Sequence, residues 1–171
     1  MNSVNKYNVK LNNEFFKITV YSLLSFFISF TFSSPQLLIG SIINSILIFS
    51  VFNIKKDVTF LLIAPSLGAL VRGALFGPFS IFLVFLMPFI WVSNFLLIKS
   101  MKFFVIEKKF NYFFSLMFSG GIKSIFLFSF TSILVWLNII PNIFLVSMGL
   151  IQFFTCFLGG LISFGLKQVR Y

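Results

Sequence analysis

Long runs of apolar residues, separated by short polar segments, dominate this chain. Residues 18–54 carry no charged side chain over 37 positions, which is enough for two helices that each cross about 30 Å of hydrocarbon. Pro35 follows two serines, and we therefore expect the turn between these helices there. Lys55, Lys56 and Asp57 end the second helix.

The rest of the chain repeats this pattern. Gly77-Pro78 and the segment around Pro141 are expected turns, and residues 99–109 form the most polar expected loop. An alternative start for the fifth helix is Gly120-Gly121, which would leave residues 112–119 along the membrane interface. The pattern predicts a short cytoplasmic tail at about 1–17 and six transmembrane helices at about 18–33, 36–54, 58–76, 79–98, 112–136 and 143–166.

Composition supports a membrane protein. Hydrophobic residues make up 59% of the chain and charged residues only 9%, whereas a soluble domain carries roughly 25% charged residues. We therefore predict an all-α, polytopic membrane protein, with residues 1–171 forming one compact bundle.

The charges predict an orientation. The chain has thirteen Lys and Arg residues but only three Asp and Glu residues. The cations are scattered singly between apolar runs, which is unlike a nucleic-acid interface. In a six-helix arrangement eleven cations fall on one side, and the positive-inside rule then puts both termini in the cytoplasm, with the protein in the cell membrane. These eleven are Lys6, Lys10, Lys17, Lys55, Lys56, Lys99, Lys102, Lys108, Lys109, Lys167 and Arg170.

The composition argues against most catalytic chemistry. The chain has no His and a single Cys, Cys156, so a zinc, haem or iron–sulfur site lacks an adequate ligand set. A serine–lysine pair through Lys123 stays formally possible. We expect neither an enzyme nor a bound metal or cofactor.

Arg72 and Lys123 are the two cations that orientation does not explain. A cation at the centre of a membrane helix costs about 2.5–3.5 kcal/mol on insertion scales, and every acid is expected on the cytoplasmic side. Both residues are therefore candidates for holding an anionic ligand group. The alternative is that Arg72 reaches the outer interface and Lys123 the inner one.

Three amide side chains lie within apolar helices. Asn44 and Gln152 share a depth and are candidates for orienting a polar ligand; the alternative is interhelical hydrogen bonding at about 0.6 kcal/mol each. Asn94 is the poorest ligand candidate, because it falls near the end of the predicted fourth helix.

Small residues at four-residue spacing favour close helix contacts. Ser25, Ser29 and Ser33 form such a ridge on the first helix, which lies at the edge of the chain and is therefore the most plausible surface for a partner. Internal packing is the default interpretation of every such ridge, including this one and that of Ala69, Gly73 and Gly77 on the third helix.

Five segments together resemble a known family, the small six-helix membrane proteins grouped with substrate-binding (S) components of energy-coupling factor transporters. The resemblance covers roughly residues 20–165. The segments are GSIINSILIF (40–49), APSLGALVRGALFGP (64–78), LMPFIWVSNFLLI (86–98), GGIKSIFLF (120–128) and GLIQFFTCFLGGLIS (149–163).

This resemblance implies a binding subunit for a vitamin-like or trace nutrient. Such a subunit captures its ligand near the outer surface, joins a membrane coupling protein and two cytoplasmic ATPases, and topples to deliver the ligand inward. The family docks its coupling protein through alanines on the first helix, where this chain has Ser25, Ser29 and Ser33. The alternative hypothesis is a non-transporting assembly or scaffold subunit, which would bind no small molecule.

Overall fold

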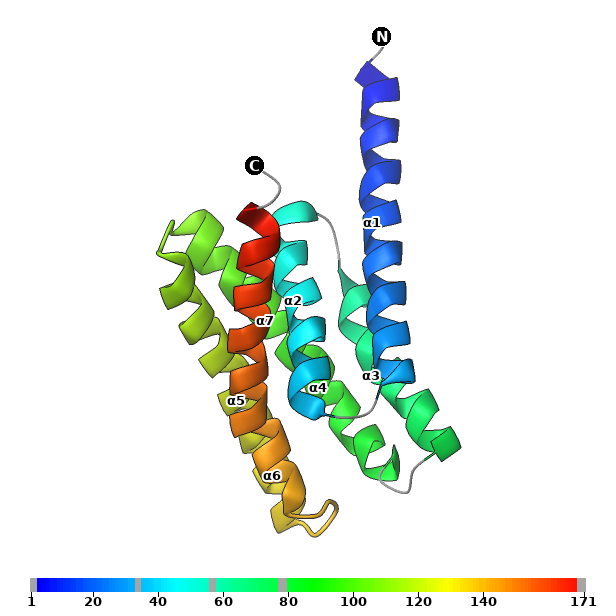
Figure 1. Ribbon diagram of the computed structural model, residues 1–171, viewed down its shortest axis with the longest axis vertical. Coiled ribbons are helices and arrows are strands. Elements are labelled where there is room, and N and C mark those ends of the chain that lie inside the picture. The colour runs from blue at the N-terminus through cyan, green and yellow to red at the C-terminus, as the bar shows by residue number, and fades with distance from the viewer. Residues whose placement is uncertain (1–2, 33–34, 56–57, 77–79, 169–171) are drawn as a thin grey trace.

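The computed structural model describes residues 3–32, 35–55, 58–76 and 80–168, and every regular element in these ranges is a helix. Figure 1 shows the helices running largely along one direction, with both termini toward the same end. The elements are α1 (Ser3–Thr31), α2 (Gln36–Asn53), α3 (Thr59–Phe76), α4 (Ser80–Met101), the π-helix η1 (Lys102–Glu107), α5 (Tyr112–Trp136), α6 (Ile143–Met148) and α7 (Leu150–Gln168).

Within the described ranges, five helical segments are long and apolar enough to cross a membrane. The third predicted span is the exception, because α3 offers only a shorter apolar stretch, Thr59–Leu75. The all-helical class and the multi-pass character thus agree with the sequence. The five long segments are Asn13–Thr31, Gln36–Asn53, Phe82–Glu107, Tyr112–Trp136 and Ile143–Leu166.

The first helix begins earlier than expected. The sequence predicts a tail up to residue 17, whereas α1 starts at Ser3 and extends beyond the other helices in Figure 1. Glu14 and Lys17 are three residues apart in this helix, a spacing at which opposite charges stabilise a helix.

The fourth helix ends later than expected. The sequence predicts an end at residue 98 and a polar loop, but α4 reaches Met101 and continues as η1 to Glu107. Leu97 and Met101 are fully buried in the core, so burial stabilises the extra turn. Lys99 is exposed on the opposite face, with its ammonium 5.4 Å from the centre of the Phe95 ring. Lys99 therefore lies on the exposed face of a helix and does not mark the start of a loop.

The fifth and sixth predicted helices also have observed counterparts. α5 has the predicted range, and Gly120-Gly121 lie within it. Asn111 caps the helix, because its side chain accepts a hydrogen bond from Phe113 N at 2.9 Å. The sixth predicted helix is divided into α6 and α7 at Gly149, whose missing side chain leaves room for the Phe128 ring.

A close contact between α2 and α7 sets the register of the site. A Cβ atom added to Gly159 would lie 2.6 Å from Ser41 O and 2.8 Å from Ser45 N, both of which are backbone atoms that cannot move aside cheaply. A Cβ atom added to Gly40 would lie 2.7 Å from the methyl carbon of the Thr155 side chain. Small residues thus let the two backbones approach and place Asn44 opposite Thr155.

The serine ridge of α1 faces the protein interior. Ser25 and Ser29 are buried, and α1 packs on α3, where Gly68 leaves no room for a Cβ beside the backbone carbonyl of Phe26. The two serines are therefore not exposed to a partner in this arrangement, which agrees with the packing alternative. Ser33 and Gly77 lie outside the described residues.

Gly159→Ala tests the α2–α7 contact. We expect it to lower the free energy of unfolding by about 1–3 kcal/mol, the usual cost of inserting a methyl group into a packed contact. Gly165→Ala on the same helix is the matched control, because a Cβ there meets no atom within 4 Å, so it should leave stability unchanged or slightly raised. Detergent titration of both variants measures the difference, and an equal effect at the two positions would contradict the contact.

Candidate functional site

A cavity of about 460 Å³ lies between the helices. Its wall includes Phe144, Ser147 and Met148 of α6, and α6 lies at the end of the molecule opposite the termini in Figure 1. Its volume is within the range of small-molecule sites, about 300–1,000 Å³. All four residues proposed from the sequence as ligand contacts line it: Asn44, Arg72, Lys123 and Gln152.

Lys123 is the most unusual residue on the wall. It lies near the middle of α5, and only 3% of its surface is exposed. Its ammonium donates to Asn44 Oδ1 at 2.7 Å and to Asn94 Oδ1 at 2.8 Å. The alternative in which Lys123 reaches the inner interface therefore does not describe this structure.

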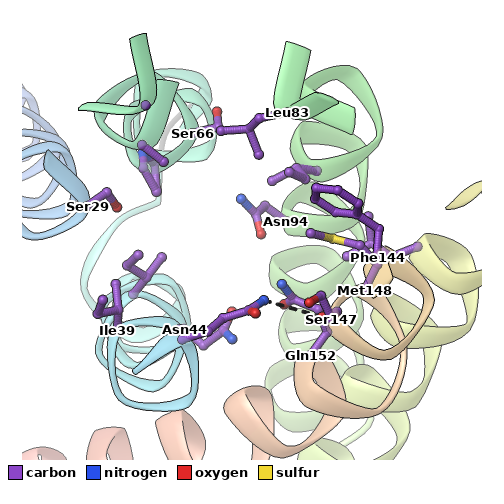
Figure 2. Close-up of a pocket in the computed structure, with 18 of the residues that line it drawn as sticks. Ser29, Ile39, Asn44, Ser66, Leu83, Asn94, Phe144, Ser147, Met148 and Gln152 are labelled. Atoms are coloured by element: carbon purple, nitrogen blue, oxygen red, sulfur yellow. Dashed lines mark hydrogen bonds between the residues drawn. The ribbon is translucent and has the colours of Figure 1, made fainter. Parts of the chain in front are cut away.

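Further hydrogen bonds fix both amides. Asn44 Nδ2 donates to Thr155 Oγ1 at 3.0 Å, and the Thr155 hydroxyl donates to the backbone carbonyl of Gln152 at 2.9 Å. Asn94 Nδ2 donates to the backbone carbonyl of Leu62 at 3.2 Å. Each amide thus has its oxygen directed to Lys123, and Figure 2 shows the Asn44 and Asn94 side chains reaching into the same space from different helices.

Asn44 had two interpretations from the sequence, ligand orientation and interhelical hydrogen bonding. Both ends of its amide are engaged by protein groups in this structure. It is therefore a positioning residue for Lys123, and in that respect it resembles the interhelical hydrogen bond that was the alternative.

Asn94 is the site residue that sequence reasoning undervalued. It lines the cavity and holds Lys123, although the predicted helix end at residue 98 placed it near the membrane surface. Because α4 continues to Met101 and η1 extends to Glu107, Asn94 lies well inside the helix. The buried residues Leu97 and Met101, which follow at helical spacing, were the signal that the helix continues.

Arg72 and Gln152 occupy other parts of the wall. Arg72 lies about one turn before the end of α3, is only partly buried, and donates through Nη1 to the backbone carbonyl of Thr31 at 3.4 Å. The side chain of Gln152 makes no hydrogen bond to any described residue and is directed toward the cavity in Figure 2. Both retain donors that could bind a ligand.

The charged side chains among the described residues of the cavity wall are the cations Arg72 and Lys123, and none of these described wall residues is a carboxylate. The described part of the chain also has no group of three His, Cys, Asp or Glu residues that could hold a metal ion. An ammonium has three N–H donors, and the two amide oxygens take two of them. The remaining N–H of Lys123 can therefore bind an electron-rich group.

A double-mutant cycle tests the contact between Lys123 and Asn94. We expect Lys123→Met and Asn94→Leu each to lower the free energy of unfolding, and the double variant to lose about 0.5–3 kcal/mol less than the sum, because each single change already removes the shared hydrogen bond. Lys123→Met with Asn111→Ala is the control pair and should be additive, since the two side chains share no partner. Additivity in the first pair would show that the contact is not made.

Comparisons with known proteins give this chain no relative. No protein-family model matches it, no curated protein matches it, and no solved structure matches it.

Proposed function

We propose that this protein is the membrane-embedded substrate-binding subunit of an uptake transporter for a micronutrient, either vitamin-like or a trace nutrient. The observation that carries the proposal is the cavity of about 460 Å³ with Lys123 buried on its wall. A cation kept at this depth by two oriented amides is costly to maintain, and such intramembrane ionisable residues usually serve a function. The resemblance of residues 20–165 to energy-coupling factor S components agrees with this role.

The proposed topology has six spans in one compact bundle, with both termini in the cytoplasm. Together with the five longer segments, α3 makes six spans. Its 18 residues extend about 27 Å at 1.5 Å per residue, which is close to the hydrocarbon thickness. Lys17, Lys55, Lys99 and Lys108 then fall on the cytoplasmic side, as the positive-inside rule requires. The cavity, at the end opposite the termini, would open toward the outer surface of the cell membrane.

Transport by this chain requires partners. The sequence has no nucleotide-binding motif, so ATP hydrolysis would come from cytoplasmic ATPase subunits, joined through a membrane coupling subunit as the resemblance implies. A docking role for the ridge of Ser25, Ser29 and Ser33 requires α1 to move, because Ser25 and Ser29 are buried.

Native mass spectrometry of protein purified in a mild detergent tests the binding role. We expect the wild type to retain a small molecule from the host cells, and Lys123→Gln to bind it about ten- to hundredfold more weakly. That range corresponds to the loss of a hydrogen bond to a charged group, about 1.5–3 kcal/mol. Lys99→Gln is the matched control: it removes an exposed cation outside the cavity and should retain the molecule fully.

Two outcomes would count against the proposal. A wild-type protein that retains no small molecule but co-purifies with a fixed protein partner would favour the assembly or scaffold alternative. Equal retention by Lys123→Gln and the wild type would keep a binding function but remove Lys123 from the site.

A further inference from the structure

Lys123 lacks a counter-charge within the described protein. Its two partners, Asn44 and Asn94, are neutral amides, which stabilise a cation as dipoles but leave the net charge uncompensated. Of the described carboxylates, neither Glu14 nor Glu107 lines the cavity, and Glu107 is exposed at the end of η1. The titratable group that interacts with Lys123 inside the protein is the thiol of Cys156, which is a far weaker acid than a carboxyl group. A carboxylate beside Lys123 would therefore have to come from the bound molecule.

The cavity wall also has more free donors than free acceptors. Lys123 has one N–H beyond the two that the amides accept. The Ser29 hydroxyl is buried, lines the cavity and has no hydrogen-bond partner among the described residues. The Gln152 amide adds two N–H groups, and its oxygen is one of the few acceptors. A ligand that satisfies this wall presents oxygen acceptors to it.

The remainder of the wall is largely apolar. Ile39, Ile43, Ile90, Leu127 and Met148 contribute hydrocarbon side chains, which bind apolar parts of a ligand by excluding water. Lys123 is the fully buried cation of the cavity, whereas Arg72 is partly exposed and bonded to Thr31 O. A single deeply buried positive charge matches a head group with one negative charge.

We infer that the ligand is an organic carboxylate with an apolar body, whose carboxylate binds Lys123 and supplies the counter-charge that this residue lacks. The inference rests on the proposed binding function and names the class of substrate. A phosphate with two negative charges fits less well, because one charge would stay uncompensated at the depth of Lys123. Two sources share the inferred chemistry: a soluble carboxylate taken up from outside, and a fatty acid from the bilayer.

Asn44→Asp is a sharp test, because it places a carboxylate beside Lys123 with almost no change in shape. The Thr155 hydroxyl, which now donates to Gln152 O, can turn to donate to the new carboxylate. We expect the ligand-free variant to melt at a temperature at least about 2 °C above that of the ligand-free wild type. We also expect it to lose the molecule that the wild type retains in native mass spectrometry, by tenfold or more, because the new charge repels an anion.

Asn111→Asp is the matched control. It adds the same charge at an exposed position outside the cavity, where Asp caps a helix as well as Asn does. Both the melting temperature and the retention should therefore equal those of the wild type.

The identity of the retained molecule completes the test. Its mass and fragmentation should show a carboxylic acid, and purification after growth in defined medium separates a soluble nutrient from a fatty acid, since only the nutrient disappears when its source is withdrawn. A retained neutral molecule, a retained phospholipid alone, or full retention by Asn44→Asp would overturn the inference while leaving a binding function in place. A wild type that retains nothing would instead remove the proposed function itself.

Discussion

The hydrogen bonds from Lys123 to Asn44 and Asn94 organise the centre of this protein. They join α5 to α2 and α4 at distances of 2.7 and 2.8 Å, and the bond from Asn44 to Thr155 extends the network to α7. Four helices are thus connected through one buried ammonium. A polar network of this kind is stabilising only when its members are satisfied, and the free N–H of Lys123 is the member for which the described protein offers no acceptor.

Close packing makes this network possible. Gly159 lets α7 approach the backbone of α2, and Gly40 leaves room on α2 for the Thr155 side chain of α7. This close contact brings Asn44 within hydrogen-bonding distance of Thr155. Without hydrophobic driving force between helices in lipid, such packing and interhelical hydrogen bonds hold a bundle together. The site and the fold therefore depend on the same small residues.

The sequence predicted the helices well because uncharged runs and Pro or Gly turns are strong local signals. It also identified Arg72, Lys123, Asn44 and Gln152, because polar groups in apolar runs are conspicuous, and all four line one cavity. It could not assign their roles, since these depend on which helices are neighbours. The position of Asn94 was misjudged because Lys99 suggested a loop, whereas the buried residues Leu97 and Met101 continue the helix.

The pattern of small residues also limited what could be predicted at the first helix. The ridge of small residues at Ser25 and Ser29 indicates a close contact but not its partner; here both residues are buried, and α1 packs on α3. The same limit applies to any helix whose apolar residues cover all its faces, because lipid and protein select for similar side chains.

The central claim is that Lys123 lies on a ligand cavity and is held there by Asn44 and Asn94. An experimental structure of the protein, purified with its bound molecule in a lipid nanodisc, tests this claim most directly. We predict density for a non-protein oxygen within about 3 Å of Lys123 Nζ, with the hydrogen bonds from Lys123 to Asn44 and Asn94 kept. A Lys123 side chain that extends to the membrane surface, with the cavity filled by neighbouring side chains, would contradict it.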